Sequence, residues 1–140
     1  MIQPSETLRI VTGVIEKSLP KTEWTHQAHL RAGLWHVLHY DELAALDLMR
    51  VRIRAYNEAT GGANTETTGY HETITRFYLR LIRSFLNGLN RDMPVDELAD
   101  LVVLHLGDRE LPLKYYSRAC LFSPEARANW VPPDLTALPI

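Results

Sequence analysis

Histidine is the residue type most able to support chemistry in this chain, and four of the six histidines fall within EWTHQAHLRAGLWHVLHYDE, residues 23–42. These four are His26, His29, His36 and His39. Neutral imidazole binds zinc and other first-row divalent ions, and it also acts as a general base near neutral pH. His26 and His29 are three residues apart, so on a helix they project from neighbouring positions of one face. This pair is therefore the first candidate for a shared metal ion.

The same stretch predicts a helix that begins after a candidate N-cap, Thr25, and continues to about His39. At about 100° per residue, its apolar centre is formed by Leu30, Leu34, Val37 and Leu38. His26 lies beside that centre, and His29 and His36 lie farther round on the same flank. We therefore expect His26, His29 and His36 to border the core, while His39 lies still farther round and is the least suited of the four to converge with the others.

A further ligand must come from another element, and the segment GYHETITRFYLRLIRSFL, residues 69–86, supplies the candidates. His71 falls on the apolar arc of the helix predicted over residues 70–89, whereas Glu72 falls on the polar arc. Glu72 stands four residues before Arg76, which predicts an ordinary ion pair between them. Glu66, in the preceding polar segment, is a second carboxylate that can reach the histidines. His71 is therefore the better third ligand.

The set His26, His29 and His71 allows two interpretations. Three imidazoles with an open fourth position suit zinc or another first-row divalent ion, which can polarise a substrate or lower the pKa of a bound water. Buried histidines are also often structural residues that only satisfy hydrogen bonds. The chain lacks HExxH, the more specific zinc motif with its own general base. Both interpretations therefore remain open.

The rest of the chain predicts a single all-α domain over residues 1–140, with about five helices. Helical periodicity extends over residues 5–19, 25–39, 42–59, 70–89 and 94–105, although β-branched residues leave a strand as the alternative for the first segment. Residues 60–69 are rich in Gly and Thr and predict a loop. The remainder, residues 108–140, holds five of the eight prolines and predicts an irregular tail that wraps the bundle, with one short helix at SPEARANW.

Composition excludes several classes of partner. The net charge is −2, with 15 basic and 17 acidic side chains, so no overall field attracts nucleic acid or an anionic membrane. No run of about 18 apolar residues and no basic, apolar leader is evident. With Cys120 as its single cysteine, the chain predicts a cytoplasmic protein. A homodimer is an expectation from size alone, without a specific seam.

The segments WTHQAHL and GYHETIT and the tail YYSRACLFSPEARANWVPPD together resemble a family of small bacterial helical proteins of unknown function. That family shows similar TH-x-x-HL and YHET-type segments, and the resemblance covers about residues 24–133. The family pattern emphasises the positions that match His26, His29, His71 and Glu72. The resemblance therefore makes Glu72 a candidate ligand or general base. It implies no established activity.

Two functional hypotheses follow. In the first, His26, His29 and His71 bind a divalent metal in a pocket between helices, with Glu72 or Glu66 completing the shell or acting on a bound water. The protein would then carry out metal-assisted hydrolysis or another small-molecule reaction. In the second, the protein is a non-catalytic ligand-binding or interaction module, and the histidines form a hydrogen-bonded cluster.

Overall fold

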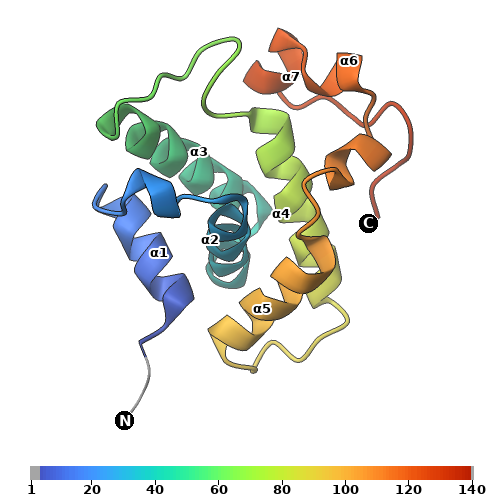
Figure 1. The fold of residues 1–140 in the computed structure, drawn as a ribbon. Helices are drawn as coiled ribbons and strands as arrows, with labels where there is room; N and C mark the ends of the chain where they lie inside the picture. The colour runs from blue at the N-terminus through green and yellow to red at the C-terminus, as the bar shows by residue number, and fades with distance from the viewer. Residues whose placement is uncertain (1–3, 140) are drawn as a thin grey trace.

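Five long helices account for most of the computed structural model, which describes residues 4–139 (Figure 1). They are α1 (Glu6–Ile15), α2 (His26–His39), α3 (Glu42–Ala59), α4 (Glu72–Leu86) and α5 (Val95–Leu106). Residues 4–139 contain no β-strand, so the all-α prediction is confirmed and the strand alternative for the first segment is wrong. Within the same range, no helix has the length and apolar character needed to cross a lipid bilayer.

Side-chain caps explain where several of these helices begin. Ser5, Thr25, Asp41 and Ser123 each accept a hydrogen bond from the backbone amide three residues later. Each bond satisfies one of the amides that lack a partner in the first turn of a helix. The predicted starts of the helices after Thr25 and Asp41 are therefore confirmed.

Helix α2 lies in the middle of the bundle and packs against α1, α3, α4 and α5 (Figure 1). Its predicted apolar centre is buried: Leu30, Leu34 and Val37 are almost fully enclosed. Gly33 allows α4 to approach closely, because a Cβ at this position would lie 3.2 Å from Cδ1 of Ile82. The helix that carries four histidines is thus held on several sides.

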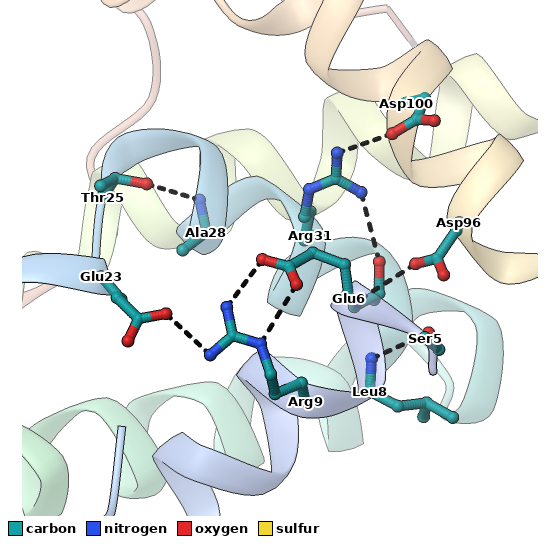
Figure 2. A network of polar contacts seen from close by, with 11 residues as sticks. Ser5, Glu6, Leu8, Arg9, Glu23, Thr25, Ala28, Arg31, Asp96 and Asp100 are labelled. Carbon is teal, nitrogen blue, oxygen red and sulfur yellow. Dashed lines mark hydrogen bonds and ion pairs between the residues drawn. The ribbon is translucent and has the colours of Figure 1, made fainter. Parts of the chain in front are cut away.

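A polar network fixes the start of α2 relative to its neighbours, as Figure 2 shows. Arg9 of α1 pairs at 2.7 Å with Glu23, which lies in η1 (Lys21–Glu23), the short 3-10 helix that leads into α2. Arg31 of α2 donates to Asp100 of α5 at 2.6 Å and to Thr7 of α1 at 3.4 Å. Exposed ion pairs contribute little individually. Together they connect α1, η1, α2 and α5 at the end where His26 lies.

The C-terminal residues after α5 pack beside α4. They form three short helical turns, whereas the sequence predicted one. These are η2 (Leu111–Lys114), α6 (Arg118–Leu121) and α7 (Pro124–Ala128). The last two lie beside the first turns of α4 (Figure 1). Thr73 of α4 anchors them, because its hydroxyl donates to the carbonyl of Asn129 at 2.7 Å and accepts from the amide of Val131 at 3.1 Å.

Candidate functional site

A cavity of about 400 Å³ lies between α2, α3 and α4, beside the start of α2. We call it the α2–α4 cavity. Its apolar lining comes from Leu30, Met49, Ile53, Ile74, Leu79 and Ile82. Its polar lining comes from Trp24, Thr25, His26, His29, Thr75, Tyr78 and Arg109. Most of the wall surface is nevertheless apolar, because several of these polar residues carry aromatic rings, and such a wall in a volume of this size is typical of a site for a small molecule.

Three polar atoms of residues that line this cavity are buried, out of reach of a ligand unless the side chains rotate, and have no hydrogen-bond partner among the residues described. They are Nε1 of Trp24, Nε2 of His26 and the hydroxyl of Tyr78. Apart from these, only Nε of Arg76 shares this condition within residues 4–139. Buried polar groups are nearly always paired, because each unpaired group costs about 1–3 kcal/mol. The concentration of such atoms around one cavity marks it as the candidate site.

His29 keeps one ring nitrogen available. Its Nδ1 lies 2.7 Å from the carbonyl oxygen of Thr25, which can only accept, so Nδ1 carries the proton and Nε2 keeps its lone pair. The ring stacks on Trp24 with 3.7 Å between ring centroids. Burial lowers the pKa of His29 to about 4, so the imidazole is neutral at pH 7. A neutral imidazole with a free lone pair can bind a metal ion or accept a proton.

His26 and Tyr78 form the adjoining part of the wall. Their rings meet edge to face, with 5.5 Å between centroids. Burial lowers the pKa of His26, and the positive charge of Arg109 lowers it further, while the backbone carbonyl of Gly107 and the negative charge of Asp108 act in the opposite direction. Burial also raises the pKa of Tyr78, so its hydroxyl keeps its proton at neutral pH. Both side chains are therefore uncharged hydrogen-bonding groups in an apolar setting.

Arg109 supplies the formal charge of the cavity. It follows α5 in the segment that crosses the start of α2, and its charge lowers the pKa of both His26 and His29. None of the ion pairs found in residues 4–139 involves Arg109. Asp and Glu are absent from the residues that line the cavity. The polar part of the wall is consequently neutral to positive.

His71 lies outside the α2–α4 cavity and has a structural position. It is the N-cap of α4, so the prediction that it sits within the helix, on the apolar arc, is wrong. Nδ1 accepts from the amide of Ile74 at 3.1 Å, and Nε2 lies 2.8 Å from the carbonyl oxygen of Leu121, to which it donates. His71 instead lines a neighbouring cavity of about 610 Å³, which shares His29 with the first one. The structure therefore brings His26 and His29 to one cavity, and His29 and His71 to the next.

Glu72 is also occupied by partners within the protein. The Arg50 guanidinium of α3 donates to its two carboxylate oxygens at 2.9 and 2.6 Å, and the hydroxyl of Tyr70 donates at 2.7 Å. The predicted ion pair with Arg76 is thus wrong. Burial would raise the pKa of Glu72, but the hydrogen bonds from Arg50 and Tyr70 outweigh it and hold the pKa below its ordinary value. Glu72 is ionised, and it does not line the α2–α4 cavity.

The remaining candidate ligands are dispersed. His36 is buried and fully hydrogen-bonded, with Nδ1 donating to the carbonyl of Ala32 and Nε2 accepting from Arg52. Glu66 is exposed in the loop before α4. Over the described part of the chain, no three His, Cys, Asp or Glu side chains gather where they could hold a metal ion. The site of His26, His29 and His71 with zinc or another divalent ion stays a prediction, as does a catalytic role for Glu72.

Sequence reasoning missed three residues of the cavity wall: Trp24, Tyr78 and Arg109. Trp and Tyr combine an apolar body with one polar atom, so an aromatic residue on a core-facing arc is a usable signal. Tyr78 lies on the apolar arc of the helix predicted over residues 70–89, where the sequence pattern predicts packing alone. Arg109 gave no signal, because only the path of the chain after α5 brings it to α2.

Comparison of the chain with protein-family models, with curated proteins and with solved structures found no match. The resemblance to the bacterial helical family stays a prediction. The geometry of the α2–α4 cavity therefore carries the functional conclusion.

Proposed function

We propose that the chain binds a small, largely apolar molecule in the α2–α4 cavity. The observation that supports this proposal is that three residues in the wall of one cavity, Trp24, His26 and Tyr78, each carry an unpaired buried polar atom, which rotation of the side chain can turn toward a ligand. A ligand that supplies hydrogen-bond partners there removes a cost of about 1–3 kcal/mol for each atom it pairs. The apolar remainder of the wall then fixes the body of the ligand.

The hydrophobic contribution is large enough for useful affinity. A ligand that buries about 150 Å² of apolar surface gains about 4 kcal/mol, at about 25 cal/mol per Å². One or two hydrogen bonds to the unpaired atoms add to this gain, against the cost of losing free motion. Millimolar affinity, which needs about 4 kcal/mol, is within reach of these contributions.

The test uses N-phenylnaphthylamine, a neutral fluorophore whose emission rises in apolar surroundings. We expect saturable binding of one probe per chain, with energy transfer from Trp24, which lines the cavity. Ile74→Trp places a larger side chain in the wall and should reduce the affinity at least about tenfold. Leu43→Trp makes a similar change on the surface, where Leu43 is 67% exposed, and should leave binding unchanged. Melting temperatures of both variants check that they fold.

Two outcomes contradict the proposal: absence of saturable binding to the unmodified protein, or undiminished affinity in a folded Ile74→Trp variant. If Ile74→Trp does not fold, Gly33→Ala is the second variant. Its added Cβ lies 3.2 Å from Cδ1 of Ile82 at the cavity wall and should weaken binding by a smaller factor.

The second candidate function is binding of a divalent metal ion by His26 and His29. It is favoured by the unpaired Nε2 of His26 and the free lone pair of His29, one helical turn away. A bound molecule or water would complete the coordination. Elemental analysis of untagged protein decides it, and we expect one equivalent of metal per chain. The metal should be lost in His26→Ala and retained in Gln27→Ala, which changes a neighbouring exposed position. Metal-free protein in every preparation rules it out.

A further inference from the structure

We infer that the molecule bound in the α2–α4 cavity carries a single carboxylate, held by the polar part of the wall beside the start of α2, which includes Trp24, Tyr78 and Arg109. This inference rests on the binding proposed above and names the class of ligand. The ligand is then an amphipathic carboxylic acid: an apolar body lies against α2, α3 and α4, and one anionic end lies at the polar part of the wall.

Charge is the first argument for an anion. Arg109 is the residue of the wall with a fixed charge, and no acidic side chain lines the cavity. The preceding residue, Asp108, accepts a hydrogen bond from the amide of Glu110 at 2.9 Å and is exposed at the surface, although its negative charge raises the pKa of His26 and Tyr78. An anion in the cavity would therefore meet an arginine whose ion-pairing capacity the described residues leave unused.

Hydrogen-bond polarity is the second argument. The indole Nε1 of Trp24 can only donate, so the group that pairs with it must be an acceptor. The hydroxyl of Tyr78 keeps its proton and can donate as well. A carboxylate offers two acceptor oxygens with about four lone pairs, which can satisfy both donors and the Arg109 guanidinium together. A hydroxyl or an amine at this end would leave donors unpaired.

The position beside the start of α2 is the third argument. His26 is the first residue of this 14-residue helix, and Thr25 precedes it. The first turn of a helix carries partial positive charge, which favours an anion close to it. A single arginine with two neutral donors suits a monoanion. A phosphate ester, with about two negative charges at pH 7, would need more cationic partners than the wall provides.

The test compares three ligands that share one aromatic body: naphthoate, its neutral carboxamide and naphthyl phosphate. Each competes with N-phenylnaphthylamine for the unmodified protein. We expect naphthoate to bind at least about tenfold more tightly than the carboxamide, because a charge-assisted pair with arginine exceeds a neutral hydrogen bond. Naphthyl phosphate should bind more weakly than naphthoate.

Substitutions in the cavity wall then test which residues cause the preference for naphthoate over the carboxamide. Arg109→Gln should lower the affinity for naphthoate about tenfold while leaving the carboxamide and N-phenylnaphthylamine unchanged. Arg109 is exposed, so the variant should fold normally. Arg91→Gln, an exposed arginine in the turn before α5, is the matched control and should change no affinity. Tyr78→Phe should lower the affinity for naphthoate by a smaller factor.

Each outcome bears on a definite statement. Equal affinities for naphthoate and the carboxamide, or an Arg109→Gln variant that still prefers naphthoate, overturn the carboxylate assignment while the binding function stands. Tighter binding of naphthyl phosphate than of naphthoate overturns it in favour of a phosphate ester. Failure of N-phenylnaphthylamine and all three ligands to bind overturns both the assignment and the proposed function.

Discussion

At the scale of single residues, His71 and Glu72 join the start of α4 to two other parts of the molecule. His71 caps the helix with Nδ1 and bonds the carbonyl of Leu121 in α6 with Nε2. Glu72 accepts two hydrogen bonds from Arg50 in α3. Ile74, which lines the cavity, follows within a single turn of α4, so these bonds also fix one side of the site.

The Glu72 contacts predict a clear effect on stability. Glu72→Gln preserves the shape of the side chain but removes the charge that Arg50 and Tyr70 meet. We expect the free energy of unfolding to fall by about 2 kcal/mol, the usual range for hydrogen bonds to a charged group. Urea denaturation measures this change. Glu66→Gln in the exposed loop is the control, with an expected change below about 0.5 kcal/mol. Unchanged stability in Glu72→Gln would contradict a structural role.

At the scale of the element, the starts of helices could be predicted because a cap and its amide are only three residues apart. Thr25 and Asp41 illustrate this local rule. The buried face of α3 also follows helical periodicity, since Leu46, Met49 and Ile53, spaced three or four residues apart, are all buried. The partner of Glu72 was not predictable, since Arg50 is 22 residues away and only packing of α3 on α4 brings the two together. Pattern within one helix cannot contain that information.

The docking of the C-terminal elements on α4 depends strongly on Thr73. Thr73→Val removes a hydroxyl that both donates and accepts, and it leaves the carbonyl of Asn129 and the amide of Val131 without this partner. We expect a loss of about 2–3 kcal/mol in the free energy of unfolding. In hydrogen-exchange measurements, Thr73→Val should speed exchange in residues 118–131 more than in α2, each compared with the unmodified protein. Thr67→Val in the exposed loop should change neither measurement. Unchanged protection of residues 118–131 would contradict the anchoring role.

At the scale of the whole molecule, the cavity is a product of tertiary packing. Its wall joins Trp24 to Arg109, and helices α2, α3 and α4 all contribute to it. The sequence predicted which faces of these helices are apolar, but a helical wheel cannot show where two apolar faces fail to close completely. Gly33 and Ile82 set that spacing, because α2 and α4 meet there. The histidine pair beside an inter-helix pocket was therefore predictable, while the size of the cavity and the residues that complete its wall were not.

Buried neutral histidines should also make the stability of the whole molecule depend on pH. Burial lowers the pKa of His36, which is 2% exposed, from 6.5 to about 4. Between these values the unfolded chain binds a proton that the folded chain does not. The contribution of the neutral His36 to the free energy of unfolding is therefore fully present above pH 6.5, decreases as pH falls and is lost below about pH 4. For His36 alone the decrease is about 3 kcal/mol.

Urea denaturation from pH 7 to pH 4 measures this dependence. Burial lowers the pKa of His29 to about 4 as well, so the two residues act in the same direction. His36→Gln should have lower stability at pH 7, because Arg52 and the carbonyl of Ala32 lose their partner, but a shallower decrease toward pH 4. His39→Gln removes an exposed imidazole from the same helix and should keep the original slope. A slope that His36→Gln leaves unchanged would show that this buried imidazole is not the source of the pH dependence.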